Sequence, residues 1–217
     1  REFFVVRGQS SAPETAGKGF LRRALGIAFA PKLRYDIFCE TKTVREVFYM
    51  RDGFVKVAAG TPKIRVADCR YNAEQIFTLM READKQGVRV LCLPELCLTG
   101  YTCGDLFLQD TLLRGAEEGL ATILEATKNL DLVTALGLPV RCKWDNKVYN
   151  CAAVIQGGEI LGLVPKTYLP NYGEFYEQRW FASGKGADFG LELLGQQVSL
   201  CDRQLFACKE MPDLVIG

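Results

Sequence analysis

The chain has 217 residues, 48% of them hydrophobic and 24% charged, and its formal net charge is +1; this composition indicates a globular domain and excludes the basic field that binds nucleic acid or an anionic membrane. No apolar run reaches the roughly 18 residues that a membrane-spanning helix needs. The nine cysteines lack C-x-x-C spacing and there is no histidine, which excludes Ser-His-Asp and Cys-His catalysis and the usual histidine-containing zinc sites, and favours a reduced, cytoplasmic protein without a metal site.

Residues 1–49 differ from the rest of the chain. They include the polar, small-residue stretch "RGQSSAPETAGKGFLRRALG" and show no sustained hydrophobic period, and the first methionine is Met50. We interpret residues 1–49 as a leader or extension outside the domain, and residues 50–217 as the domain itself. A transit-like peptide and a small docking arm are the alternatives for the first segment.

The pattern from residue 54 onward alternates between strands and helices. Residues 54–60 and 63–68 have the alternating or apolar character of strands. Asn72 is expected to cap a helix that runs through about Gln86, since apolar side chains then recur on one face. The apolar run at residues 88–93 predicts a buried strand.

The second half of the domain continues this alternation. Residues 110–129 predict a long helix and residues 130–140 a buried strand. A hairpin is predicted at residues 148–166, with the Gly-Gly pair at 157–158 as its turn. Residues 213–217, "DLVIG", open a further apolar strand. Helices that alternate with buried strands indicate a two-layered or sandwiched α/β domain.

Two charged residues stand where apolar strands end. Glu95 follows "VRVLCLP" and Lys166 follows "EILGLVP". Each has an ordinary interpretation, as a turn residue or a solvated surface lysine, but a carboxylate beside a buried strand is costly unless a partner pairs with it. The aromatic loop at residues 167–176 is of the kind that lines ligand sites. We therefore predict that the two side-chain tips converge to within about 3–5 Å.

Three segments carry a family resemblance. "LPELCLTGY", "PKTYLP" and "YEQRWFASG" resemble the nitrilase superfamily of carbon–nitrogen hydrolases, which use a Glu, a Lys and a Cys at strand exits. The longer segments "ELCLTGYTCGDLFLQD" and "KTYLPNYGEFYEQRWF" resemble the glutaminase domain that opens bacterial glutamine-dependent NAD synthetases, over about residues 54–217. The resemblance implies an α/β fold, a nitrilase-type α-β-β-α sandwich, incomplete at the C-terminus.

The resemblance also implies roles for individual residues. Glu95 would be the general base that activates the cysteine and returns the proton to ammonia, and Lys166 would stabilise the oxyanion. A second acid would orient the lysine, and the match selects Glu177, with Glu174 as the alternative. Three aromatic residues match positions that border the glutamine pocket, although packing within the loop is an equal alternative for them: Tyr101, Tyr172 and Phe175.

The nucleophile stays open at this point. Cys201, in "VSLCDRQLF", resembles the nucleophile turn of simple nitrilases. However, its strand is short and polar upstream, and the NAD-synthetase-like segments imply an extra hairpin that residues 196–210 fit. The resembling enzymes place a Cys-Glu-Asp turn shortly after a strand like that at residues 213–217. We therefore expect the nucleophile beyond Gly217, in a domain that is truncated in this chain.

The function implied by the resemblance is hydrolysis of the glutamine amide, with the ammonia passed to a fused C-terminal NAD synthetase domain that converts deamido-NAD to NAD. ATP and Mg²⁺ would bind that domain, which this chain lacks, and no cofactor is expected in the glutaminase domain. A homo-oligomer is expected, because nitrilase-like sheets usually pair across subunits. A stand-alone amidase that uses Cys201 and a non-catalytic nitrilase-like scaffold are the alternatives.

Overall fold

The computed structural model describes the backbone of residues 3–7 and both backbone and side chains of residues 54–211 and 213–217. Its elements are, in chain order, β1 (Phe3–Arg7), β2 (Val57–Ala59), α2 (Cys69–Lys85), β3 (Val90–Cys92), η2 (Tyr101–Leu108), α3 (Asp110–Ala126), β4 (Val133–Arg141), β5 (Val148–Gln156), β6 (Glu159–Pro165), α4 (Glu177–Trp180), β7 (Asp188–Leu193), β8 (Gln196–Cys201), β9 (Gln204–Cys208) and β10 (Val215–Ile216). Among the described residues, no helix combines the length and the hydropathy of a membrane span.

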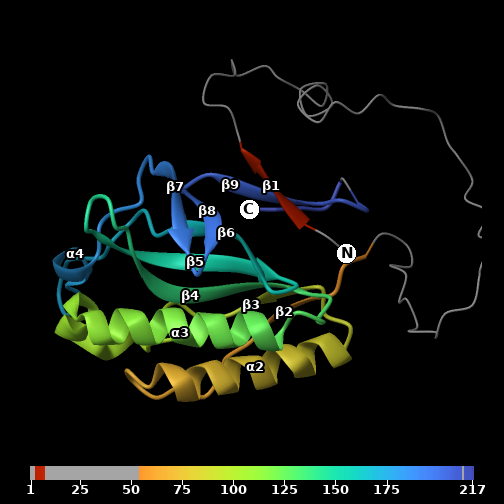
Figure 1. The fold of residues 1–217 in the computed structure, drawn as a ribbon, viewed down its shortest axis with the longest axis horizontal. Helices are drawn as coiled ribbons and strands as arrows, with labels where there is room; N and C mark the ends of the chain where they lie inside the picture. Colours follow the sequence, from red (N-terminus) through yellow and green to blue (C-terminus); the bar gives the residue numbers. More distant parts are fainter. Residues whose placement is uncertain (1–2, 8–53, 212) are drawn as a thin grey trace, which may run out of the picture.

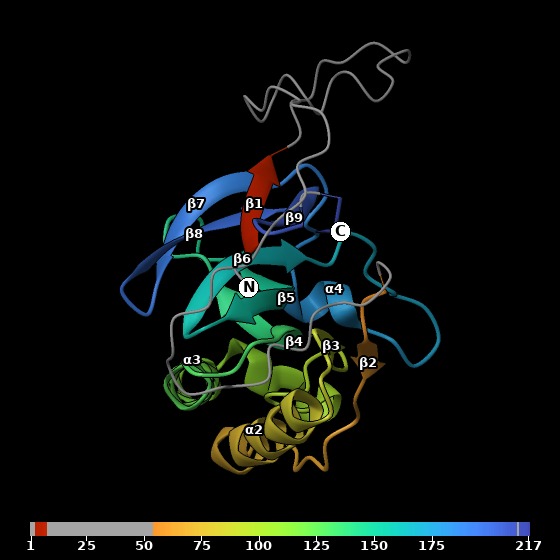
Figure 2. The same ribbon diagram turned by 90° about the vertical axis from the view of Figure 1, so that its right-hand side faces the viewer.

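The strands form two sheets that lie in separate layers. A seven-stranded sheet has the order β2-β3-β4-β5-β6-β8-β7, and a three-stranded sheet has the order β1-β9-β10. In the large sheet β2, β3 and β4 are parallel, whereas β5 runs antiparallel to both of its neighbours, β4 and β6. Helices α2 and α3 cover one face of the large sheet, and the small sheet lies across the other side (Figures 1 and 2). The described residues therefore form three layers in the order helix, sheet, sheet.

Helices α2 and α3 pack on the large sheet through apolar residues three or four positions apart. Ile76 and Met80 on α2, and Leu120 and Ile123 on α3, are at most 1% exposed. This spacing places the residues of each pair on one helical face. Each such side chain contributes about 1.5–3 kcal/mol on burial, so this layer accounts for a large share of the core.

The predicted helix over residues 72–86 begins earlier than expected. Helix α2 starts at Cys69, and the side chain of Asp68 caps it by accepting a hydrogen bond from the Tyr71 amide at 3.1 Å. Asp and Asn are equally good cap residues, and the expectation that Asn72 caps the helix was wrong because Asp68 takes that role. Asn72 lies inside the first turn and is fully buried.

The strand predicted at residues 63–68 is absent from the described structure, which shows an irregular loop there. Asn72 explains the difference. Its Oδ1 accepts from the Arg65 amide at 2.7 Å, and its Nδ2 donates to the Arg65 carbonyl at 2.8 Å. The backbone groups that a strand would offer to a neighbour are thus used by one side chain.

Of the two predicted hairpins, one forms and the other does not. Strands β5 and β6 form the predicted hairpin, and both Gly157 and Gly158 have positive φ. The hairpin expected over residues 196–210 does not form: β8 and β9 are joined by a short turn but belong to different sheets, and β8 pairs with β7 instead. The strand expected at residues 213–217 is present as β10, which pairs with β9.

Residues 1–49 were expected to lie outside the domain. Five of them form β1, which pairs antiparallel with β9 in the small sheet, with Val5 opposite Phe206. This strand corrects the expectation: residues 1–49 as a whole lack a hydrophobic period, but the short apolar run "FFVV" at residues 3–6 has the composition of a strand. Residues 8–49 lie outside the described residues, and for them the expectation stays a prediction.

Candidate active site

Glu95 lies in a tight turn that follows β3 and rests on the neighbouring strand β4. The turn has hydrogen bonds to the Leu96 carbonyl from the amides of Thr99 (3.1 Å) and Gly100 (2.7 Å), and Leu96 has a φ of 50°. On β4, a Cβ atom at Gly137 would collide with the Leu96 nitrogen and lie 2.7 Å from the Glu95 carbonyl carbon. Only a residue without a side chain lets the turn approach this closely, so Gly137 allows the turn that carries Glu95 to lie against β4.

A Gly137→Ala substitution should therefore destabilise the domain by about 1–3 kcal/mol or more, because the new methyl group meets backbone atoms that cannot rotate away. Urea unfolding of the purified chain measures this change. Gly190→Ala is the matched control, since Gly190 also lies in a strand but a Cβ there has its nearest neighbour at 3.9 Å. Equal stability of the two variants would contradict the close-approach argument.

Lys166 lies directly after β6 and meets Glu95 as predicted. Its backbone amide donates to the Asn150 carbonyl at 2.7 Å, which continues the β5–β6 ladder past the strand end. Its Nζ donates to Glu95 Oε1 at 2.8 Å. The predicted convergence of the two tips, from residues far apart in the chain, is confirmed.

A second carboxylate completes this cluster from the short helix α4. Glu177 is 1% exposed, and its Oε1 accepts from Lys166 Nζ at 2.9 Å and from the Tyr101 hydroxyl at 2.7 Å. Its Oε2 is buried without a hydrogen-bond partner in the described structure. Of the two candidates for the second acid, Glu177 is the one that contacts the lysine, and Glu174 is exposed.

Asn150 belongs to the cluster and was missed from the sequence. It lies on β5, is 3% exposed, and its side-chain Nδ2 donates to Glu95 Oε1. Its carbonyl also accepts a hydrogen bond from the Lys166 amide, so Asn150 contacts both Glu95 and Lys166. The available signal was a lone amide in the otherwise apolar strand "VYNCAAVI", since a buried polar side chain needs a partner.

The electrostatics favour a charged lysine. Partial burial lowers the pKa of the Lys166 ammonium, but its hydrogen bonds and ionic attraction to Glu95 and Glu177 outweigh this and raise the pKa above its usual value. Burial and the neighbouring Glu177 carboxylate raise the pKa of Tyr101 well above its usual range. At neutral pH the cluster therefore holds an ammonium and a phenol, both of which donate hydrogen bonds to carboxylates.

The three aromatic residues predicted to border a substrate occupy different environments. Tyr101 uses its hydroxyl to hold Glu177. Tyr172 is 72% exposed and its ring packs against that of Phe175 in a T-shaped contact with centroids 5.7 Å apart. These contacts agree with the packing alternative, and the binding role of the three residues stays a prediction.

Cys201 is the last residue of β8 and is buried. The Cys201 sulfur accepts a hydrogen bond at 3.5 Å from the Arg203 amide, which lies in the turn directly after β8. Two cysteines near Glu95 also bond elsewhere: the Cys97 thiol donates to the Gly137 carbonyl and the Cys103 thiol to the Thr99 carbonyl. Burial raises the pKa of Cys97 to about 11. Among the described residues, no hydrogen bond joins a cysteine to Glu95 or Lys166.

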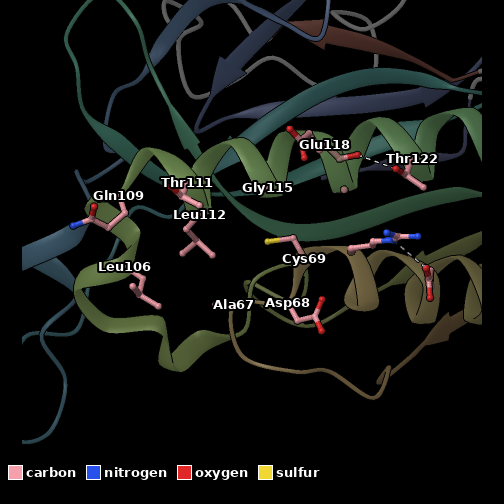
Figure 3. Close-up of a pocket in the computed structure, with 13 residues that line it drawn as sticks. Ala67, Asp68, Cys69, Leu106, Gln109, Thr111, Leu112, Gly115, Glu118 and Thr122 are labelled. Atoms are coloured by element: carbon pink, nitrogen blue, oxygen red, sulfur yellow. Dashed lines mark hydrogen bonds and ion pairs between the residues drawn. The ribbon is translucent and has the colours of Figure 1, made fainter.

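A cavity of about 870 Å³ opens away from this cluster, between the start of α2, the end of η2 and α3 (Figure 3). Its lining is mixed, with acidic side chains such as Asp68 and Glu118 beside small residues such as Gly115. Glu95, Lys166 and Glu177 do not line it. The cavity is therefore a feature of the helical layer and not of the Glu–Lys cluster.

Comparisons with known proteins agree on one family. The family model described as carbon-nitrogen hydrolase matches residues 56–209. The glutamine-dependent NAD(+) synthetase of Mycobacterium tuberculosis is 37% identical over 164 residues, which are 76% of this chain and 24% of that protein. This chain thus spans about a quarter of that relative. The synthetase of Aquifex aeolicus is also 37% identical, over 62% of this chain and 23% of its own length.

Solved structures show the same likeness. A crystal structure of a glutamine-dependent NAD(+) synthetase from Cytophaga hutchinsonii has a TM-score of 0.63 and 30% identity, covering 75% of this chain and 27% of that one. An amidase of the nitrilase superfamily from Nesterenkonia, at 22% identity, has a TM-score of 0.53 over 68% of this chain and 55% of its own; at this identity the likeness concerns the fold. Together these results confirm the predicted nitrilase-type α/β fold.

Proposed function

Since the chain belongs to the carbon–nitrogen hydrolase family, we propose that it forms the glutaminase part of a glutamine-dependent NAD synthetase. The observation that carries the proposal is the cluster in which Lys166 bonds both Glu95 and Glu177, at 2.8 and 2.9 Å. An acid, an ammonium and a second acid at strand and helix ends supply what amide hydrolysis by a cysteine requires in the absence of histidine.

In the proposed reaction Glu95 takes the proton of a cysteine thiol as its sulfur attacks the glutamine amide carbon. The carbonyl oxygen becomes an oxyanion, and the Lys166 ammonium stabilises it. As the intermediate collapses, the carbon–nitrogen bond breaks and Glu95 returns the proton to the leaving ammonia. Water then hydrolyses the thioester to release glutamate. Glu177 and Asn150 hold Lys166 and Glu95 in place throughout.

The proposed part in NAD synthesis is supported by the relatives of this chain. They are glutamine-dependent NAD(+) synthetases of which this chain covers about a quarter, so the ammonia acceptor belongs to the remainder of such a protein. We propose that ATP and Mg²⁺ bind there, in a fused synthetase domain that converts deamido-NAD to NAD. The proposal includes a cytoplasmic protein that assembles as a homo-oligomer.

The nucleophile is proposed to lie beyond Gly217, because the Cys201 sulfur is bonded within its own turn. The purified 217-residue chain should then release no ammonia from glutamine, whereas the full-length product of the encoding gene should release it and lose the activity on alkylation with iodoacetamide. Ammonia release measures both.

Robust turnover by the 217-residue chain that disappears in Cys201→Ala would replace this proposal by a stand-alone amidase. Turnover that survives Cys201→Ala would contradict both assignments of the nucleophile. A full-length product whose cysteines are alkylated by iodoacetamide but which hydrolyses no amide would favour the alternative of a non-catalytic scaffold.

A further inference from the structure

The segment η2 and the helix α4 are joined by an ionic contact outside the Glu–Lys cluster. The Asp105 carboxylate accepts hydrogen bonds from Arg179 Nε at 2.7 Å, from Arg179 Nη2 at 2.9 Å and from Trp180 Nε1 at 2.9 Å. Both Asp105 and Arg179 have side chains that are 61% exposed. An exposed ion pair adds little stability, but a two-pronged arginine–carboxylate contact fixes the relative orientation of the groups that carry it.

The position of α4 matters because its first residue is Glu177. The helix has four residues, too few to be stable on their own. The Glu177 carboxylate is held through Oε1 by Lys166 and Tyr101, while Oε2 has no hydrogen-bond partner in the described structure. The orientation of this carboxylate therefore depends on where the backbone of α4 is held.

Segment η2 contacts α4 at three points. Tyr101 bonds the Glu177 carboxylate, Asp105 bonds the last two residues of the helix, and the Phe107 ring lies 6.0 Å from that of Trp180 between centroids. Phe107 is fully buried, so η2 itself is anchored in the core. An anchored segment that grips a short helix at both ends can set the position of the acid that the helix carries.

We propose that Asp105 is a positioning residue for the cluster: by fixing Arg179 and Trp180 it holds α4 so that Glu177 stays on the Lys166 ammonium. Its effect on catalysis rests on the function proposed above. Its effect on Lys166 does not, because the lysine–glutamate contact exists with or without turnover. The two can therefore be measured separately.

The test compares Asp105→Ala and the isosteric Asp105→Asn with Asp110→Asn. Asp110 is the matched control, since it is also an exposed aspartate paired with an arginine, Arg141. In the full 217-residue chain, the pKa of Lys166 is followed by NMR of its labelled side chain, together with the melting temperature. In the full-length gene product, kcat and KM for glutamine are measured.

We expect the pKa of Lys166 to fall toward its usual value of 10.5 in both Asp105 variants and to stay unchanged in Asp110→Asn. The kcat should fall roughly ten- to a hundredfold, with KM within about twofold, because a small misplacement of catalytic groups is costly. The melting temperatures of Asp105→Asn and Asp110→Asn should be close. An unchanged Lys166 pKa in both Asp105 variants, or an equal change in Asp110→Asn, would overturn the proposal. A shifted pKa in a protein whose wild type never hydrolyses glutamine would support the positioning role and refute the proposed function.

Discussion

Replacing Glu95 by glutamine in the full-length gene product is expected to lower the rate of glutamine hydrolysis by roughly 10²–10⁴-fold, the usual contribution of a general acid–base group. Glutamine has nearly the same shape, so its side chain can still lie beside Lys166 and Asn150. It cannot accept the thiol proton or return it to ammonia. The loss should therefore appear mainly in kcat.

Glu174→Gln provides the matched control for this measurement. Glu174 is exposed in the loop before α4. The Glu174→Gln enzyme should hydrolyse glutamine within about twofold of the wild-type rate, because exposed substitutions usually have small effects. A Glu95→Gln enzyme with more than a tenth of the wild-type kcat would show that another group transfers the proton. A large loss in Glu174→Gln would return that residue to the candidates for the second acid.

Replacing Lys166 by methionine is expected to destabilise the domain by about 3 kcal/mol, the lower end of the range for removing one partner of a buried ion pair. The reason is Glu177, which is 1% exposed and would lose the ammonium that compensates its buried charge. The lower end applies because Lys166 itself is 28% exposed. The corresponding drop in melting temperature is roughly 6–12 °C for a domain of this size.

The double variant Lys166→Met/Glu177→Gln tests whether the lost stability comes from the unpaired charge of Glu177 or from the packing of the replaced lysine side chain. It removes the unpaired charge, and the amide oxygen of the new glutamine can still accept the Tyr101 hydroxyl, so part of the lost stability should return. Lys128→Met is the control, since Lys128 pairs with the exposed Glu125 and should change stability by less than about 1 kcal/mol. If the double variant is no more stable than Lys166→Met, the buried-charge explanation is wrong.

The stability lost in Lys166→Met should depend on pH. Because the pKa of Lys166 is raised in the folded protein, the ion pair contributes its full stability below the unfolded value of about 10.5 and loses it as the pH rises through the folded pKa. The stability difference between wild type and Lys166→Met should be constant from pH 7 to 9 and shrink above about pH 10.5. Urea unfolding across this range measures it.

The sequence predicted the large elements and the convergence of Glu95 with Lys166 because both depend on local patterns. Apolar strands with charged exits are visible in one dimension, and the family resemblance pointed to Glu177 beyond them. The contacts of Asn150 and Asp105 were not predicted, since each depends on an element distant in the chain: Asn150 bonds Glu95 from β5, and Asp105 bonds α4 from η2.

The errors in the fold have the same origin. Residues 63–68 have a strand-like pattern, but Asn72 captures the backbone of Arg65. The strand β1 has a strand-like apolar run, "FFVV" at residues 3–6, but its partner is not visible locally, because β9 lies about two hundred positions away in the chain. In both cases the outcome depends on tertiary hydrogen bonds, which propensity and periodicity do not encode.

We propose that this domain, as part of the full-length gene product, releases the glutamine amide nitrogen for NAD synthesis. The most direct measurement supplies the full-length gene product with deamido-NAD, ATP, Mg²⁺ and glutamine labelled with ¹⁵N at the amide, and then analyses the NAD by mass spectrometry. We predict that the amide of NAD carries the label, that Glu95→Gln abolishes this transfer, and that ¹⁵N-ammonium restores labelling in that variant. NAD without label from glutamine in the wild type, under conditions where ¹⁵N-ammonium labels it, would contradict the account.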